Sequence, residues 1–457
     1  MSEQLIDWDL ALIQKYNYSG PRYTSYPTAL EFSESFSEDD FTRAAERYPE
    51  RALSLYVHIP FCHKLCYFCG CNKVVTRQRH KADQYLDALE REIRHQAPRF
   101  GQRQVSQMHW GGGTPTYLNK AQIGRLMGLL RENFRFNDDA ELSLELDPRE
   151  IELDMLDHLR AEGFTRLSMG VQDFNKEVQR LVNREQDEEF IFALIARARE
   201  LGFTSTNIDL IYGLPKQTPE SFAFTLSKVA ELSPDRLSVF NYAHLPTLFA
   251  AQRKIKEDDL PSAQQKLDIL QQTIASLTGA GYQFIGMDHF ARPDDELAVA
   301  QRNGVLHRNF QGYTTQGDTD LLGLGVSAIS MLGDCYAQNQ KELKKYYQQV
   351  EEQGDALWRG LTLTRDDCIR RDIIKALICN FRLDFADIER AWQLDFHNDF
   401  AEDLALLAPL AQDGLVDIND QGIQVTAKGR LLIRNICMCF DIYLRRKAKL
   451  QKFSRVI

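Results

Sequence analysis

Three cysteines in one short loop imply chemistry more directly than any other residues of this sequence. Cys62, Cys66 and Cys69 follow the pattern Cys-x3-Cys-x2-Cys and come directly after the β-rich run LSLYVHI. A four-iron cluster is normally held by four cysteines, so three leave one iron open, as a catalytic metal site leaves a position for substrate. The spacing therefore predicts an iron-sulfur cluster with a reactive iron.

Two other metal sites are compatible with the loop if spacing alone is considered: a structural zinc knuckle, and a closed cluster that takes Cys71 as its fourth ligand. A zinc ribbon needs a second pair of ligands far along the chain, and Cys437 and Cys439 have the wrong spacing for one. Cys71 follows Cys69 by only two residues, which would strain it as a ligand. We therefore expect Cys71 to lie beside the cluster without binding it.

Polar residues end several later β-rich runs. Glu145 closes the run ELSLEL, Gln172 follows RLSMGV, and Asp209 interrupts NIDLIY. Each alone would more often be a solvated strand-end residue or a helix cap. Parallel strands present their carboxyl ends at one edge, however, so these three side chains are expected to converge there and to bind hydroxyl and amino-acid groups of a ligand.

Other candidate residues flank the same runs. The segment HWGGGTPTYL contains Gly111–Gly113, where a ligand could approach the backbone, although a glycine run alone is usually a turn. Tyr56 precedes the cysteine loop and Phe68 lies inside it; each could be a buried aromatic or could contact a cofactor. Arg184 fits either the surface or a carboxylate partner.

Alternating β-rich and amphipathic segments position these residues. Six short β-rich runs between 53 and 242 are separated by helical patterns such as Tyr85, Leu86, Leu89 and Ile93 on one face. Such repeats predict an α/β fold, a partial (β/α)6 TIM-like barrel over residues 51–335, with functional groups at the carboxyl ends of the strands. A tyrosine- and proline-containing arm (1–50) precedes the barrel, and a mostly helical domain with a small wing (360–457) follows it.

Whole-chain composition favours a small-molecule enzyme. The 457 residues carry a formal net charge of -10, so we expect no nucleic-acid partner. No leader-like start and no run of about 18 apolar residues occur, so we expect a cytoplasmic chain with no membrane partner. Nine cysteines, four of them between 62 and 71, suit a metal site better than disulfides. No apolar stripe demands a second subunit, and a monomer is expected.

The cysteine loop after the first strand of a β/α barrel, taken with the glycine run, resembles the radical S-adenosylmethionine (SAM) superfamily. The resemblance implies one [4Fe-4S] cluster on Cys62, Cys66 and Cys69, with the methionine amine and carboxylate of SAM on the open iron. It also implies reductive cleavage of SAM to a 5'-deoxyadenosyl radical that abstracts hydrogen from substrate. Thr114 follows Gly113 where the wider superfamily often has an acidic residue, so the likeness is to one branch.

Over nearly its full length the sequence is similar to the oxygen-independent coproporphyrinogen III oxidase family. This implies removal of a β-hydrogen from the propionates of rings A and B of coproporphyrinogen III, with loss of carbon dioxide and one electron from each, to give the vinyl groups of protoporphyrinogen IX in heme biosynthesis. An electron donor and an electron acceptor are implied as partners. The similar segments are NYSGPRYTSYPTA, VHIPFCHKLCYFCGCN, HWGGGTPTYL, SLELDPRE, GVQDFN, NIDLIYGLP, FNYAHLP, HRNFQGYTT and LLGLGVSAIS.

The family resemblance further implies two SAM molecules at adjacent sites. Catalytic roles fall to the three cysteines and Tyr56. The cluster-bound SAM would be lined by Tyr56, Gly112, Glu145 and Ile329, and the second SAM by Phe68, Gly113, Thr114, Gln172, Arg184, Asp209 and Ala243.

The polycarboxylate substrate calls for arginine or lysine, and Arg22 and Arg308 are candidates, although both could be surface residues. The main alternative is a heme-binding chaperone of the same superfamily, which shares the cysteine loop. The tyrosine-rich arm and the segment Cys69-Gly70-Cys71-Asn72 favour the oxidase. A non-catalytic zinc scaffold is a third class, which would contain zinc and lack a visible absorption band.

Overall fold

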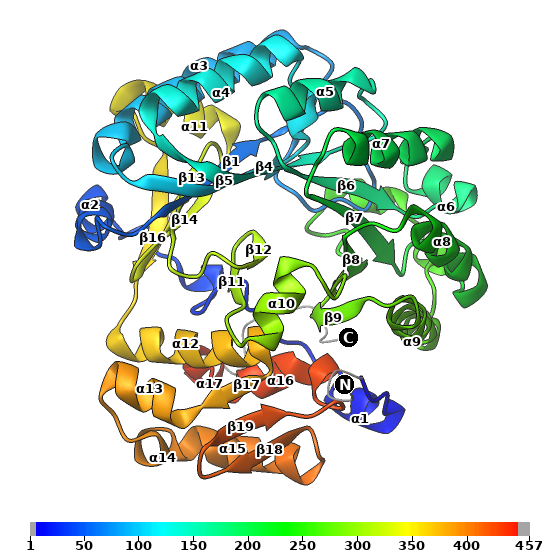
Figure 1. Ribbon diagram of the computed structural model, residues 1–457, viewed down its shortest axis with the longest axis vertical. Helices are drawn as coiled ribbons and strands as arrows, with labels where there is room; N and C mark the ends of the chain where they lie inside the picture. Colours follow the sequence, from blue (N-terminus) through cyan, green and yellow to red (C-terminus); the bar gives the residue numbers. More distant parts are fainter. Residues whose placement is uncertain (1–5, 447–457) are drawn as a thin grey trace. The chain divides into compact units, whose positions relative to one another are not determined.

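The structure is a computed structural model that describes residues 6–446. It contains two compact units, each with its own core (Figure 1). The larger unit comprises Phe32–Thr273 and Asp318–Thr362. The smaller comprises Ile274–Gly317 with the described residues of Met1–Glu31 and Leu363–Ile457.

A parallel sheet forms the core of the larger unit. Its six central strands are hydrogen-bonded in chain order, as consecutive β/α units require. All six β-rich runs are strands, so the predicted partial (β/α)6 barrel is confirmed. The strands are β1 (Leu53–Ile59), β4 (Gln104–Gly112), β5 (Arg135–Leu146), β6 (Arg166–Gln172), β7 (Ser205–Tyr212) and β8 (Arg236–Asn241).

The sheet continues beyond β1, which the sequence did not predict. One further strand runs parallel to β1, and three more follow it in antiparallel order. The first of them, DLLGL, is wholly buried, and periodicity does not separate such a short apolar run from a buried helix. The added strands are β13 (Asp320–Leu324), β14 (Ile329–Leu332), β15 (Cys335–Asn339) and β16 (Leu357–Thr362).

Amphipathic helices connect the parallel strands. The apolar face predicted from Tyr85, Leu89 and Ile93 is fully buried, because these residues recur on one side of α3. Asn119 begins α4 with a capping box, in which its side chain accepts from the backbone of Gln122. The helices of this unit include α2 (Glu38–Arg47), α3 (His80–Phe100), α4 (Lys120–Asn133), α5 (Asp154–Ala161), α6 (Lys176–Leu181), α7 (Glu188–Glu200), α8 (Pro219–Leu232) and α11 (Leu343–Gln353).

Helices also dominate the smaller unit, and its predicted wing is a hairpin that turns at Asp420 and Gln421, as expected. None of the described helices is long and apolar enough to cross a bilayer. Its elements are α1 (Leu10–Tyr16), β9 (Gln283–Gly286), β10 (His289–Ala291), α10 (Glu296–Arg302), β11 (His307–Asn309), β12 (Gly312–Thr314), α12 (Arg365–Asn380), β17 (Arg382–Asp384), α13 (Phe385–Trp392), α14 (Phe396–Asp399), α15 (Ala401–Gln412), β18 (Val416–Asn419), β19 (Gly422–Val425), α16 (Ile433–Met438) and α17 (Ile442–Arg446).

The compact units divide the chain differently from the three segments expected from its sequence. The first part of the arm packs with the C-terminal helices: Tyr23 donates to Asp441 at 2.9 Å, and Asn435 donates to the Tyr16 carbonyl at 3.0 Å. α2 belongs instead to the larger unit, and the division at residue 273 falls within α9 (Ala263–Gly279). These units are defined by packing, so the domain boundaries at 50, 335 and 360 stay predictions.

Candidate active site

The cysteine loop is closed at its base by a short parallel pairing. β2 (Phe61–Cys62) pairs with β3 (Val74–Val75), and the Val74 N–H donates to the Pro60 carbonyl at 2.7 Å. The Thr76 N–H donates to the carbonyl of Cys62 at 3.0 Å. These bonds fix both ends of the loop at the carboxyl end of β1, where a barrel places its functional groups.

Cys66 lies against two guanidinium groups. Arg149 Nη2 and Arg184 Nη1 each donate to Cys66 Sγ at 3.2 Å. Both arginines also pair with Asp147, at 2.6 and 3.1 Å respectively. Burial opposes ionisation of Asp147, yet the charges of Arg184 and Arg149 hold the pKa of its carboxyl well below the usual range. Cys66 Sγ therefore has two positively charged hydrogen-bond donors beside it.

Cys69 and Cys71 are hydrogen-bonded to each other. The Cys71 N–H donates to Cys69 Sγ at 3.4 Å. Hydrogen bonding from Cys71 outweighs burial and, with the charge of Lys73, lowers the pKa of Cys69 to about 6. The same contact raises the pKa of Cys71, an exposed residue, above its ordinary value. This geometry suits Cys69 as a thiolate ligand and Cys71 as the donor that supports it.

The chemistry of the three thiols fits an iron cluster. Thr114 Oγ1 lies 3.6 Å from Cys62 Sγ. Burial, together with charge on Cys69 and Cys66, raises the pKa of Cys62 to about 12, although the hydrogen bond with Thr114 acts in the opposite direction. A thiolate at Cys62 therefore requires nearby positive charge, which bound iron would supply.

The glycine run at the end of β4 allows a close approach to the backbone that a side chain would block. Gly112 has a φ of 113°, and a Cβ there would lie within 2.7 Å of the His58 ring. A Cβ on Gly113 would lie 2.6 Å from the carbonyl oxygen of Pro60. Gly113 and Thr114 donate backbone hydrogen bonds to Ile59 and Phe61 at 2.8 and 2.9 Å. The run is thereby held against the start of the cysteine loop.

Four predicted residues lie near the end of β1. Tyr56 stacks on His109, with ring centres 6.2 Å apart, and Glu145 Oε1 lies 3.6 Å from His109 Nε2. Tyr56 pairs in register with Gly323, and a Cβ on Gly323 would touch the backbone of Ile329 within 3 Å. The structure therefore brings Tyr56, Glu145, Ile329 and Gly112 to one region.

Gln172 and Asp209 are half-buried polar residues on neighbouring strands. Gln172 has a φ of 70°, and its Oε1 is buried without a hydrogen-bond partner among residues 6–446. Asn207 Nδ2 donates to Asp209 Oδ1 at 2.7 Å. Burial, with the charge of Glu145, raises the pKa of Asp209 to about 6. A buried acceptor and a carboxyl that titrates near neutrality are typical of a binding site for polar groups.

Phe68 and Ala243 are joined through a residue that the sequence did not single out. Gln252 is 2% exposed, and its Nε2 donates to the carbonyls of Phe68 at 3.0 Å and Ala243 at 3.2 Å. Its Oε1 accepts from the Leu245 N–H at 2.5 Å. Gln252 therefore ties the cysteine loop to the end of β8. It lies in a short 3-10 helix, Ala250–Lys254, where no sequence motif marks it.

Arg149 and Asp147 were also missed, although their position carried a signal. Both follow directly on β5, in the segment LDPRE, and the carboxyl end of a barrel strand is where functional residues are expected. Arg184 was predicted, and the structure places it on Cys66 and Asp147 with 8% of its side chain exposed.

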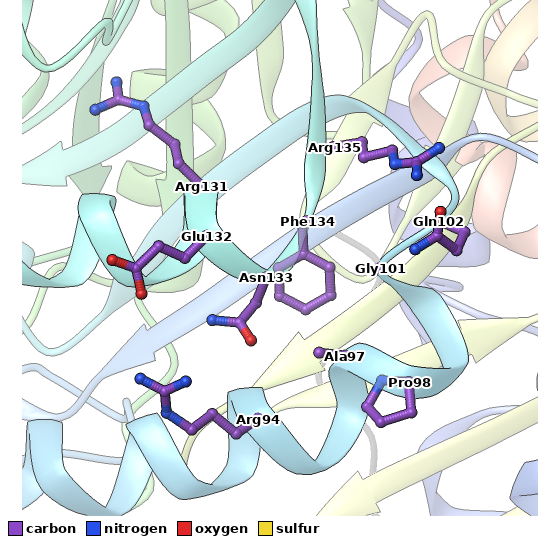
Figure 2. A pocket seen from close by; sticks show the side chains of 10 residues that line it. All are labelled: Arg94, Ala97, Pro98, Gly101, Gln102, Arg131, Glu132, Asn133, Phe134 and Arg135. Carbon is purple, nitrogen blue, oxygen red and sulfur yellow. The ribbon is translucent and has the colours of Figure 1, made fainter.

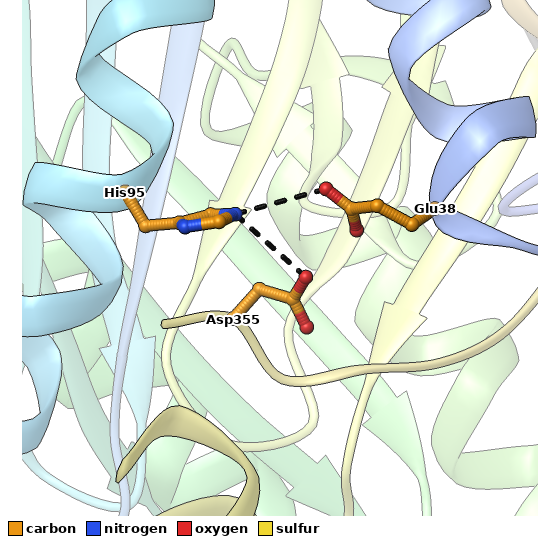
Figure 3. A group of neighbouring side chains, drawn as sticks. All are labelled: Glu38, His95 and Asp355. Carbon is orange, nitrogen blue, oxygen red and sulfur yellow. Dashed lines mark ion pairs between the residues drawn. The ribbon is translucent and has the colours of Figure 1, made fainter. Parts of the chain in front are cut away.

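Two features of the larger unit lie away from this site. A pocket of about 470 Å³ opens at the amino ends of β4 and β5, the opposite edge of the sheet from the cysteine loop (Figure 2). Separately, Glu38, His95 and Asp355 form a group of their own, with His95 Nε2 3.7 and 3.8 Å from the two carboxylates (Figure 3). Arg99 pairs with Glu38, so one of the two carboxylates already has a positively charged partner.

Comparison with known proteins gives consistent matches. Residues 56–229 match the Radical SAM superfamily and residues 363–432 the HemN C-terminal domain. The chain is 84% identical to "Oxygen-independent coproporphyrinogen III oxidase" of Escherichia coli, over 100% of both chains. It is 51% identical to the protein of that name in Pseudomonas aeruginosa, over 99% of both. The solved structure "Coproporphyrinogen III oxidase (HemN) from Escherichia coli is a Radical SAM enzyme" matches with a TM-score of 0.94 and 82% identity, covering 96% of this chain and 100% of that one.

Proposed function

The chain belongs to the oxygen-independent coproporphyrinogen III oxidase family of radical SAM enzymes, and from that premise we propose how its residues carry out the reaction. The reaction converts the propionates on rings A and B of coproporphyrinogen III to the vinyl groups of protoporphyrinogen IX. Each conversion removes one β-hydrogen atom and releases carbon dioxide and one electron. The names of the relatives support this activity over that of a heme chaperone.

The observation that carries the proposal is the donor set around the three thiols. When bound by Cys62, Cys66 and Cys69, a [4Fe-4S] cluster supplies the electron that cleaves SAM to the 5'-deoxyadenosyl radical, which takes the propionate hydrogen. Arg149 and Arg184 both donate hydrogen bonds to the sulfur of Cys66. Such donors favour the reduced, more negative state of a cluster.

We assign the cluster-bound SAM to the region near the end of β1. The Glu145 carboxylate is suited to accept hydrogen bonds from ribose hydroxyls or an ammonium group. Gly112 lets the ligand approach the backbone, because its conformation excludes a side chain. Tyr56 and Ile329 offer an aromatic face and a backbone group beside it.

A second SAM at an adjacent site is the finer part of the proposal. The buried Gln172 Oε1 supports it, since this acceptor has no partner among the described residues and suits the adenine amino group or an ammonium. The Gln252 bridge supports it too, because it holds Phe68 and Ala243 on one side of the same region. The residues assigned to this site are Phe68, Gly113, Thr114, Gln172, Arg184, Asp209 and Ala243.

Product analysis tests the reaction. The reconstituted full-length protein would be incubated anaerobically with reductant, SAM, coproporphyrinogen III and a cell extract that supplies the electron acceptor. Mass spectrometry should find loss of two carboxyl groups together with 5'-deoxyadenosine. 5'-Deoxyadenosine without porphyrinogen turnover would overturn the substrate, and neither product from a cluster-loaded sample would overturn the enzymatic function.

Equilibrium binding tests the number of SAM molecules. The cluster-loaded protein should bind two SAM per chain, and Gln172→Ala should reduce this to one while the cluster absorption is retained. One SAM per chain in the unaltered protein would contradict the second site. We further propose that the enzyme is cytoplasmic and uses a separate electron donor and electron acceptor. We also propose that it is a monomer. Sedimentation at micromolar concentration tests this, and a dimer would contradict it.

A further inference from the structure

The β11–β12 hairpin of the smaller unit carries buried donors that the described chain does not satisfy. Arg308 and Tyr313 pair across the hairpin, and the guanidinium carbon lies 4.7 Å from the ring centre. The Nε and Nη1 atoms of Arg308 are buried without a hydrogen-bond partner among residues 6–446, as is Nε2 of Gln311 at the turn. Buried unsatisfied donors are costly, especially on a charged group. Because all of them donate, the partner that they fit is an oxygen acceptor, preferably anionic.

A series of contacts leads from this hairpin to a second arginine. The ring of Tyr313 meets His289 edge-on, with centres 5.2 Å apart. The neighbouring residue, Asp288, forms an ion pair with Arg22. The Arg22 side chain is 36% exposed and that of Asp288 14%, so Arg22 stays within reach of a ligand. The two arginines named as substrate candidates from the sequence thus belong to one group of contacts.

A third arginine adds positive charge to the same group. Arg434 is 2% exposed, and it donates to the carbonyl oxygens of Gly20 and, at 2.8 Å, Pro21, next to Arg22. Burial lowers the pKa of Arg434 to about 10, and the positive charges of Arg22 and Arg308 also lower it. Three guanidinium groups therefore lie within electrostatic reach of one another. Asp288 forms an ion pair with one of the three, Arg22.

We propose that this group is a carboxylate-binding site for the propionates of the substrate, with Arg308 and Gln311 as direct donors and Arg22 as a second cationic contact. Arg434 is a positioning residue, since it acts by holding Gly20 and Pro21. The inference rests on the proposed function, and it names the substrate groups that the smaller unit recognises. Coproporphyrinogen III carries propionates that react and propionates that do not, and binding of unreacting groups orients a substrate. The planar guanidinium fork matches a carboxylate in both geometry and charge.

A binding measurement separates carboxylate recognition from general porphyrin binding. Cluster-loaded, full-length protein would be titrated with coproporphyrin III and with its uncharged tetramethyl ester, followed by fluorescence. Arg308→Gln should weaken binding of coproporphyrin III by roughly 10- to 100-fold and leave ester binding nearly unchanged. The matched control is Arg390→Gln, which removes an exposed arginine from α13 of the same unit and should bind both ligands like the unaltered protein. Unchanged coproporphyrin III binding by Arg308→Gln would overturn the site.

Kinetics distinguish failure of this site from failure of the proposed function. If the unaltered enzyme does not convert coproporphyrinogen III, the proposed function fails; if it does and Arg308→Gln has the same KM, only the carboxylate site fails. Should Arg308→Gln lose its thermal unfolding transition, Gln311→Ala and Arg308→Lys provide the same comparison with smaller changes. For Arg434→Gln, KM should rise while kcat changes little, and Arg434→Lys should restore part of the KM. Equal effects on kcat and KM would mark Arg434 as purely structural.

Discussion

Arg149 donates a hydrogen bond from Nη2 to the sulfur of Cys66 across 3.2 Å, although 83 residues separate the two in the chain. The contact arises because β1 and β5 end at the same edge of the sheet, the first leading into the cysteine loop and the second into Arg149. Asp147 holds the guanidinium in place with a 2.6 Å contact. A charged donor fixed in this way affects the electron affinity of whatever Cys66 binds.

Replacing Arg149 should therefore change the redox behaviour of the reconstituted cluster. In Arg149→Gln the lost positive charge makes reduction less favourable, and the midpoint potential should become more negative by on the order of tens of millivolts. In Arg149→Lys, which keeps the positive charge, the midpoint potential should change less. Anaerobic potentiometry followed by EPR spectroscopy measures the difference, and equal potentials in all three proteins would argue against an electrostatic role.

Substitution of Cys62 and substitution of Cys71 should have opposite effects on cluster binding. Cys62→Ser should lose both cluster absorption and SAM cleavage, because removal of one thiolate leaves too few ligands. Cys71→Ser should keep the absorption, since Cys71 meets Cys69 as a hydrogen-bond donor. Iron analysis and visible spectra of anaerobically reconstituted proteins report on both. A lost spectrum in Cys71→Ser would make Cys71 a ligand.

Gln252→Ala should loosen the cysteine loop. The substitution leaves the carbonyls of Phe68 and Ala243 without their donor, which costs about 1 to 3 kcal/mol in the free energy of unfolding. The substitution should also weaken SAM binding, because Phe68 and Ala243 are no longer held together by the Gln252 side chain. Gln264→Ala is the control, since Gln264 is exposed on α9 and contacts Asp268. A variant as stable as the control would show that solvent replaces the bridge.

The Glu38, His95 and Asp355 group should make stability depend on pH (Figure 3). Burial and Glu38 raise the pKa of Asp355 to about 7 from an ordinary value near 3.8. The native state therefore favours protonated Asp355. The contribution of this protonated group to the free energy of unfolding is lost as the pH rises towards and through about 7. The pKa of Glu38 is lowered instead, and Arg99 and His95 of α3 face its carboxylate. Gln349 of α11 contacts Asp355.

Asp355→Asn isolates the pH-dependent stability that comes from the Asp355 carboxyl, because asparagine stays uncharged. Between about pH 6 and 8, the unfolding free energy of the unaltered protein should fall relative to the variant by roughly 1 to 2 kcal/mol. Denaturant unfolding at several pH values measures it, and Asp138→Asn, at an exposed position, serves as control. A constant difference between the two proteins across this range would contradict the assignment.

Local patterns were sufficient to predict much of this architecture. Alternation within runs such as LSLYVHI, with a helical apolar face at Tyr85, Leu89 and Ile93 between strands, fixes the parallel β/α order, because both periodicities follow from backbone geometry. The spacing of Cys62, Cys66 and Cys69 is likewise a local property. The sheet extension that begins with β13 was beyond such patterns, since a short, wholly buried run such as β13 carries no distinctive period.

The sequence alone thus determined the strand order, the cysteine loop and the polar residues at strand ends, all of which depend on neighbours within a few positions. Tertiary structure alone decided that Arg149 and Arg184 meet Cys66, that Gln252 joins Phe68 to Ala243, and that Arg22 and Arg308 belong to one group of contacts. Apart from Gln252 and Ala243, the residues in these contacts are separated by tens to hundreds of positions in the chain. Their contacts depend on how strands and loops pack, and no local periodicity or spacing predicts which distant residues meet.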